Sequence, residues 1–577
     1  MLFLGSNQTS MSKTKKRLFI LTGILLVIAI AGIFSINGII AGIISGKIDG
    51  ILQKQPVKNY QISYQRVGYN LANHSAKIMN LTLSPNQAYL DSLSTTGASY
   101  TVPEIHLGKL IVSGIDYKKA FSDKHIDLNK IFVKNLKLKL WKIEGETKNT
   151  NKSAQIQIPD SIQINGLDGL FIHQLNVEKS KVELIDRKSN KTLATSSELS
   201  MLLSDFQLVS TGHQNNYFRP DVADATLQLD DFVLFTPENL YKLSAGRITI
   251  NWRDKEVLIY KLHYQPLYSK RDFSKHIKFQ TERYDFIIKN IKLSLPNVRA
   301  LVNSNNLTMP TVEISNARFN IYRDNRVPFD HSKRPLLPNQ AIKQLSVQLS
   351  INTLSIKNST FVYEEVTDRG DQPLYVNFKN LSVEITNVCN LKNRTYQESK
   401  MRANIKGQLM GKAPFEMQLL FPLKARNDTF VFSGTVYGKV PLKSFDKATY
   451  PAAGMKFKDG MLNKLTFKGG ANPYHSKGTL TFLYNNVKLD ITTNEKKETN
   501  KFLSWGATTL IRKDNPSTGK TPKQAIMAFD RNMEKGFGNF LWKTIFTGIK
   551  ATFIGGKKSL VQPRKNAHSK KSKKRKK

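Results

Sequence analysis

The stretch "LSIKNSTFVYEE", residues 354–365, decides how this chain folds. Two apolar residues two positions apart are followed, after a polar pair, by two more with the same spacing, which is typical of a strand that buries one face. Five positions separate Ile356 from Phe361, so a regular strand would turn the second pair to the opposite face. A β-bulge at Asn358 and Ser359 would restore one apolar face and bend the strand. A tight turn at this place is the alternative.

Three other stretches share this pattern: "IFVKNLKLKLW" (131–141), "LNVEKSKVELID" (175–186) and "VEISNARFNIYR" (312–323). The four starts are 44, 137 and 42 positions apart, and 137 is close to three times 46. A period in this range is typical of a repeat array, and "FIIKNIKLSL" (286–295) fits as a degenerate copy. We expect the corresponding bulges at Lys134 and Asn135, at Lys179 and Ser180, and at Asn316.

Alternation with period two dominates residues 45–510, where apolar runs are separated by Asn, Asp, Gly, Ser and Lys clusters. Short helices are expected near 116–121 and 339–345, and the proline-rich segment 326–339 predicts a break in the sheet. Repeated bulges would curl a long antiparallel sheet into a groove with an apolar inside. A sandwich of two sheets is the alternative. An uncovered apolar groove of this length would indicate a binding surface, and acyl chains would suit it.

An uncharged stretch of 27 residues at 18–44 is long enough to cross a bilayer as a helix. A cleaved signal peptide is the competing interpretation, but its apolar region is usually only about 7–15 residues long. Lys13, Lys15, Lys16 and Arg17 precede the stretch, so residues 1–17 are expected in the cytoplasm and the bulk of the chain outside it.

The charge is strongly positive, with 87 Lys and Arg against 44 Asp and Glu, which gives +43. Such an excess demands an anionic partner or environment. Because the predicted anchor places the bulk outside the cytoplasm, we expect anionic lipid and not nucleic acid. The single cysteine, Cys389, excludes an intrachain disulfide.

Motifs for catalysis are absent from the sequence. The ten histidines are scattered, and there is no glycine-rich phosphate loop, no G-x-S-x-G and no H-E-x-x-H. We therefore expect no enzyme activity, no metal and no cofactor.

The segment 511–556 predicts an amphipathic helix. Two interpretations stay open: a plug on the open end of the sheet, or a helix on a membrane surface. The residues of its apolar side are Phe529, Met533, Phe537, Phe540, Leu541, Ile545 and Phe553. The tail 557–577 has eleven basic residues and no acidic one, so its composition predicts disorder and attraction to lipid headgroups.

The anchor, "INTLSIKNSTFVYEE" (351–365) and above all the stretch 432–491, "FSGTVYGKVPLKSFDKATYPAAGMKFKDGMLNKLTFKGGANPYHSKGTLTFLYNNVKLDI", resemble the AsmA-like proteins of the Gram-negative envelope, relatives of AsmA and TamB. The resemblance implies a single-pass inner-membrane protein. Its periplasmic part would be a long curled β-sheet with a hydrophobic groove that carries phospholipid between membranes. The basic tail is not a feature of that family.

Together these observations predict an inner-membrane-anchored periplasmic protein that binds lipid acyl chains and supports outer-membrane homeostasis. An alternative is a structural or assembly factor for outer-membrane proteins that acts through its sheet edges. The residues expected in the lipid groove are Val133, Leu138, Val177, Val182, Ile314, Phe319, Ile356, Phe361, Phe482 and Leu489.

Overall fold

A computed structural model describes residues 59–553, with gaps at 71, 96–98, 116–124, 145–161, 164–168, 211–216, 297, 299–305, 368–371, 392–399, 425–426 and 492–510. The predicted anchor, the cytoplasmic segment before it, the basic tail and the helix expected at 116–121 lie outside the described residues. Among the residues that the structure does describe, no helix is long and apolar enough to cross a membrane.

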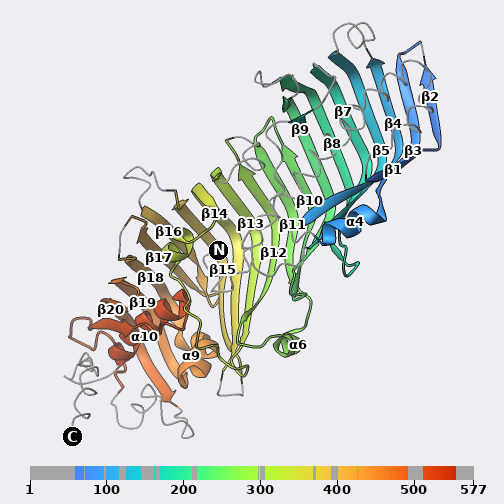
Figure 1. The fold of residues 1–577 in the computed structure, drawn as a ribbon. Helices are drawn as coiled ribbons and strands as arrows, with labels where there is room; N and C mark the ends of the chain where they lie inside the picture. The colour runs from blue at the N-terminus through green and yellow to red at the C-terminus, as the bar shows by residue number, and fades with distance from the viewer. Residues whose placement is uncertain are drawn as a thin grey trace, which may run out of the picture.

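The described residues form one 21-stranded sheet, in which long strands lie side by side along an elongated molecule (Figure 1). The strands are β1 (Tyr60–Ser63), β2 (Arg66–Asn70), β3 (Ser75–Pro85), β4 (Tyr100–Ile115), β5 (His125–Ile143), β6 (Ile162–Gln163), β7 (Gly169–Asp186), β8 (Thr192–Ser210), β9 (Tyr217–Phe235), β10 (Tyr241–Asn251), β11 (Glu256–Pro266), β12 (Glu282–Ser294), β13 (Asn306–Asp324), β14 (Gln348–Val366), β15 (Leu374–Cys389), β16 (Lys400–Leu409), β17 (Ala413–Pro422), β18 (Phe430–Pro441), β19 (Met455–Ala471), β20 (His475–Ile491) and β21 (Gln524–Asp530).

Strand order follows chain order almost throughout. β1 and β2 both pair with β3, β6 pairs with the start of β9, and the sheet ends at β21 without closing on itself. The prediction of a purely antiparallel sheet is wrong, because β5 pairs with β7 and β13 pairs with β14 in parallel. The sheet is therefore mixed.

A parallel pair obliges the chain to travel back along the length of a strand. Residues 325–347 make this crossover between β13 and β14, and they include the proline-rich segment. The segment contains no strand, as expected, but the sheet continues past it, so the predicted break in the sheet is wrong. Leu337 in the crossover is fully buried, which places it against the core.

The helices are few and short except at the C-terminal end. They are α4 (Gln87–Ser94), α6 (Lys270–Phe273), the 3-10 helix η1 (Ser274–His276), α8 (Pro338–Lys343), the 3-10 helix η3 (Leu442–Phe445), α9 (Asp446–Ala453) and α10 (Phe537–Phe553). α8 confirms the helix expected near 339–345. The helix predicted over 511–556 is shorter than expected, because residues 524–530 form β21 and α10 begins at Phe537.

One residue with a left-handed backbone interrupts many of the long strands. Ten of these residues, with φ between +46° and +65°, are Asn80, Asn135, Lys179, Asp231, Lys261, Asn316, Asn358, Asn380, Lys439 and Asn486. Asp205 in β8 and Asn387 in β15 have the same conformation elsewhere in their strands and do not belong to this set. Non-glycine residues rarely adopt this conformation, and asparagine is among the most tolerant of it. The bulges predicted at 134–135, 179–180, 316 and 358–359 are confirmed by these positions.

The left-handed residues are in register across the sheet, so they form a line that we call the crease. Lys134 faces Glu178 and Ser315 faces Lys357, which places Asn135 beside Lys179 and Asn316 beside Asn358. On β4, Gly108 lies opposite this line, where a Cβ atom would come within 2.9 Å of the Asn135 Cβ. A bulge repeated at the same level bends every strand at the same level.

The crease keeps one face of the sheet apolar on both sides of the bend, and we call it the inner face. In β5 the buried residues are Ile131 and Val133 before the bulge, then Leu136, Leu138 and Leu140 after it. The same change of phase occurs at the other bulges, so a single apolar cluster extends from Ala76 in β3 to α10.

Candidate functional site

The inner face is the candidate site, and the crease determines which side chains lie on it. Val133 and Val177 are cross-strand neighbours, as are Leu138 and Val182. In the second parallel pair, Ile314 faces Ile356 and Phe319 faces Phe361. The sequence spacings of 44 and 42 are thus the registers of two parallel pairs. The 137-residue interval contains the antiparallel strands β8–β12, and two of these, β9 and β11, carry a left-handed residue at Asp231 and Lys261. The predicted repeat-like β architecture is therefore confirmed, whereas the spacing between its strands is not constant.

Two buried serines fix the bend in the two parallel pairs in the same way. The Ser180 hydroxyl accepts a hydrogen bond from the Leu136 N–H at 3.3 Å and donates one to the Glu178 carbonyl at 3.0 Å. The Ser359 hydroxyl accepts from the Ala317 N–H at 3.1 Å and donates to the Lys357 carbonyl at 2.9 Å. Each serine satisfies backbone groups that the bulge removes from the ladder, at 1% exposure.

The first parallel pair is closed by the protein's own side chains. Val133, Leu138, Val177 and Val182 are 0–3% exposed, and the inward residues of β4 and β8 around them are also buried. Four of the ten predicted groove residues therefore lie on the expected face but are inaccessible to a lipid chain in this conformation.

The second parallel pair lies in a more open part of the inner face. Ile314, Phe319, Ile356 and Phe361 are all half-buried. Six inward residues of the neighbouring strands β10–β12 share this partial exposure, whereas Ala245, Ile250, Val257 and Ile288 on the same strands are buried. The six are Leu243, Ile248, Ile259, Leu262, Ile291 and Leu293. We call the inner face of β10–β15 the open segment.

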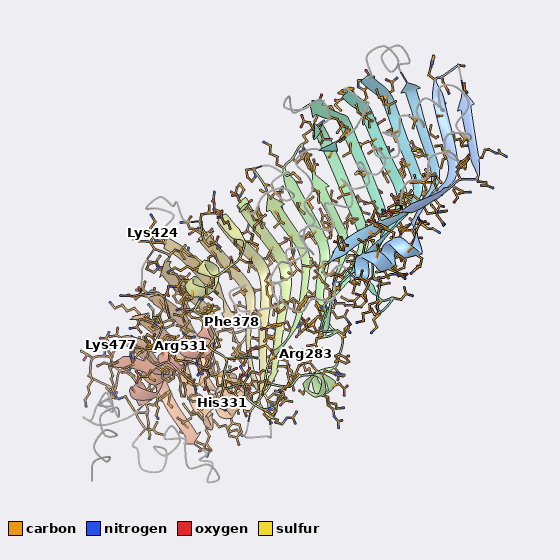
Figure 2. The ribbon with its side chains drawn as sticks, in the orientation of Figure 1. Arg283, His331, Phe378, Lys424, Lys477 and Arg531 are labelled. Carbon is orange, nitrogen blue, oxygen red and sulfur yellow. The ribbon has the colours of Figure 1, made fainter. Side chains whose placement is uncertain are left out.

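A row of aromatic side chains crosses the open segment. Five of them occupy successive strands as cross-strand partners: Tyr264, Phe286, Phe319, Phe361 and Phe378. Ring centres are 5.4 Å apart for Phe286 and Phe319, and 5.9 Å apart for Phe361 and Phe378. Figure 2 labels Phe378 near the middle of the sheet. All five are half-buried, so each ring keeps part of its surface accessible on the inner face.

Sequence reasoning missed three members of this row: Tyr264, Phe286 and Phe378. Tyr264, Phe319 and Phe361 each follow the left-handed residue of their strand by three positions, and Phe378 precedes Asn380 by two. An aromatic residue three positions after the bulge, as in β11, β13 and β14, is therefore a signal that the sequence contains.

A tyrosine-rich cluster closes the open segment at one end of its strands. Tyr241 stacks on Tyr264 with ring centres 4.6 Å apart, and Phe273 of α6 packs against Tyr241 at 5.7 Å. The Tyr241 hydroxyl donates to the Glu282 carbonyl at 3.2 Å. Burial raises the pKa of Tyr264 to about 12, because the phenolate would lose its hydration in this cluster.

Charged groups near α10 are mostly paired. The Arg323 guanidinium lies 3.1 Å from Glu282, and the Asn325 amide donates to Glu365 at 2.7 Å. The Lys535 ammonium lies 4.0 Å from the centre of the Phe329 ring, and burial lowers the pKa of this lysine. These groups tie the crossover and the start of α10 to the ends of β12–β14.

α10 packs against the inner face at the C-terminal end of the sheet. Phe540 and Phe553 are 1% and 0% exposed, and Phe553 lies 5.5 Å from Phe482 between ring centres. A Cβ at Gly548 would come within 2.9 Å of the Leu480 Cβ, so glycine allows the close approach of helix and sheet. Of the predicted groove residues at this end, Phe482 is buried and Leu489 is half-buried.

The packing of α10 favours the plug over the membrane-surface helix. Phe537, Leu541 and Ile545 also pack against the apolar cluster. Phe529 belongs to β21 and Met533 to the turn before α10, so both were wrongly assigned to the helix. Burial lowers the pKa of Lys543 and Lys550, that of Lys550 to about 8, whereas a lysine on a hydrated helix face would not be desolvated.

The backbone edge of β21 is also covered by α10. The Ala528 N–H points away from β20 and donates to the Thr547 hydroxyl at 3.2 Å. A helix side chain thus takes the place that a further strand would occupy.

The side chains of the inner face are mainly aliphatic and aromatic. Among the described residues, no group of His, Cys, Asp and Glu is arranged to hold a metal ion. At the crease, the buried hydroxyls of Ser180 and Ser359 are hydrogen-bonded to the backbone. No known protein family matches this sequence, and no curated protein matches it.

Proposed function

We propose that this protein binds lipid acyl chains along the open segment of its inner face. The observation that carries the proposal is the row of five half-buried aromatic residues on successive strands, from Tyr264 to Phe378. An extended apolar face in water favours an apolar occupant. Because the row crosses strand after strand, its contacts are similar along its length, which suits a long flexible chain.

In its finer form, the proposal is intermembrane phospholipid transport by a protein anchored in the bacterial inner membrane through residues 18–44. The uncharged stretch, the basic residues before it and the resemblance to AsmA-like proteins support this location. The inner face of β4–β8 is closed by packed side chains. Transfer of a lipid along the whole molecule would therefore require these side chains to separate. Binding at the open segment requires no such change.

Site-specific photocrosslinking tests the binding directly. The photoreactive phenylalanine analogue benzoylphenylalanine would replace Phe361 or Phe378 in the full-length protein, expressed in a Gram-negative host. We expect crosslinked phospholipid at both positions, found by mass spectrometry. Thr360 is the matched control, because it neighbours Phe361 on the opposite face of β14. Equal crosslinking at Phe361 and Thr360, or none at either aromatic position, would refute the proposal.

A substitution adds a second test. Phe361→Asp places a charge in the open segment. Because burying a charge against acyl chains is costly, we expect the amount of copurified lipid to fall by at least about tenfold. Thr360→Asp should retain the lipid. Circular dichroism and gel filtration check that both variants fold.

Edge pairing with an outer-membrane protein is the second candidate. β2 pairs only with β3 among the described strands, so its other edge is available at that end of the sheet. A protein partner without bound lipid in the crosslinking experiment would favour this function.

A further inference from the structure

The outer face of the C-terminal strands, opposite the inner face, carries three cations and no acidic residue in two neighbouring cross-strand rows. Cross-strand pairing places Arg402, Leu420, Val431, Gly470 and Lys477 in one row from β16 to β20. The adjacent row runs from Asn404 through Gln418, Ser433, Lys468 and Thr479 to Ile526 in β21. Figure 2 shows Lys477 at this end of the molecule. We call these two rows the basic outer face.

The excess of positive charge is local to this end of the chain. Residues 400–491 contain 15 Lys and Arg against 5 Asp and Glu, a net charge of +10. Residues 75–210 contain 17 against 14, a net charge of +3. Arg402, Lys468 and Lys477 are exposed and form no ion pair with a described residue, whereas Lys139 and Lys181 in the N-terminal part lie beside Glu104 and Glu183.

Exposed aliphatic side chains lie among these cations. Val431 and Ile526 are each 51% exposed, the largest fractions for aliphatic residues among the described part of the chain. A shallow hollow of about 610 Å³ is lined by Arg402, Leu420, Val431 and Lys468, among others. Gly470 has no side chain to separate Val431 from Lys477, so cation and aliphatic group are neighbours on the surface.

We propose that the basic outer face docks on the surface of an anionic phospholipid bilayer. Cations with nearby aliphatic groups suit a membrane interface, where the ammonium or guanidinium meets phosphate and the aliphatic group enters the headgroup layer. Single-stranded nucleic acid would favour aromatic stacking platforms, and these two rows contain none. The last described residue, Phe553, packs against Phe482 of β20, and the basic tail follows it, so the tail starts from the same end.

Vesicle flotation with full-length protein in phosphatidylcholine nanodiscs tests the docking. The vesicles contain about 30 mol% phosphatidylglycerol in phosphatidylcholine, or phosphatidylcholine alone. The triple variant Arg402→Glu, Lys468→Glu, Lys477→Glu should weaken binding to the anionic vesicles by at least about tenfold, since each cation contributes roughly fivefold. The matched control is Lys109→Glu, Lys134→Glu, Lys137→Glu on the outer face of β4 and β5, which changes the net charge equally and should alter binding by less than about twofold.

The double variant Val431→Ser, Ile526→Ser distinguishes docking on a membrane from electrostatic attraction to any polyanion. We expect this pair to weaken vesicle binding and to leave binding of a DNA duplex unchanged. The proposal is overturned if both triple variants lose binding equally, if phosphatidylcholine alone binds as well, or if the serine pair has no effect on vesicles. Deleting 557–577 should preserve the difference between the two triple variants.

Discussion

The two parallel strand pairs of this sheet share a sequence pattern, a register and a buried serine, yet they differ in accessibility. Around β5 and β7 the inward residues are closed off, with Val133 and Val177 at 0% exposure. Around β13 and β14 the equivalent Ile314 and Ile356 are half-buried. The bulge therefore builds the same bend twice, and the bend alone does not decide whether the inner face is open.

The clearest chemical difference between the pairs lies three positions after the left-handed residue. The first pair has aliphatic residues there, Leu138 and Val182, whereas the second has Phe319 and Phe361. Aliphatic side chains from both sides of the crease fill the first bend completely. The aromatic row marks the part of the face that is left accessible, which links the open segment to a feature of the sequence.

The largest expected effect comes from a charge in the closed pair. Val177→Asp would bury an unpaired carboxylate, and we expect a loss of about 4 kcal/mol or more in the free energy of unfolding. Phe361→Asp should cost less than about half of this, because the half-buried site leaves the carboxylate in contact with water. Urea denaturation and soluble yield measure both. Equal losses would show that the two pairs are equally closed.

Removing the serine hydroxyls should affect both pairs alike. Ser180→Ala and Ser359→Ala each leave a buried N–H without its acceptor, at a cost of about 1–3 kcal/mol. Ser197→Ala, at an exposed position of β8, should change stability by less than about 0.5 kcal/mol. Denaturation midpoints provide the comparison. A clear loss of stability in Ser180→Ala with none in Ser359→Ala would mean that the second bend does not depend on its serine.

Substitution of the left-handed residues should change stability by a moderate amount. Asn358→Val forces a β-branched residue into positive φ and should cost about 1–2 kcal/mol, while Asn358→Gly should be nearly neutral. Asn135 should respond in the same way to both substitutions. Thermal unfolding reports the order of the variants. If valine is as stable as glycine, the crease does not depend on the left-handed conformation.

The smallest effect concerns the docking of α10. The pKa of Lys550 is about 8 in the folded protein because of burial, against 10.5 in the unfolded chain. Between these values the unfolded chain binds more protons, so this lysine makes stability rise with pH from about 8 to 10.5. Lys550→Met should remove that part of the pH dependence. Hydrogen exchange of α10 at about pH 7.5 and 9.5 compares the two proteins. The same slope in both would place Lys550 in solvent.

The sequence allowed the local features of the fold to be predicted, but not which parts of the inner face are accessible. The bulges followed from an odd spacing, which is a local property of residues such as Asn358. The parallel pairing was missed because a spacing of 44 or 42 was interpreted as a repeat period, although it also equals a register. Whether Val133 or Ile314 is accessible depends mainly on side chains from distant strands. The local hint is the residue three positions after the bulge, which is aliphatic in the first pair and aromatic in the second. For α10, the amphipathic pattern fits packing on the sheet as well as binding to a membrane surface. Only the contacts of Phe540 and Phe553 in the structure favour packing on the sheet.

The hydrogen bond from Ala528 to Thr547 has a consequence for self-association. Head-to-tail stacking of copies into a filament would join the first strand of one molecule to the last strand of the next, and it needs both ends of the sheet. Because every head-to-tail step uses the β21 edge, the contact of α10 with that edge hinders such growth from the first step. Two molecules could still pair through their first strands, but this would give a dimer and not a filament. The helix thus protects one edge of a long, creased sheet against polymerisation.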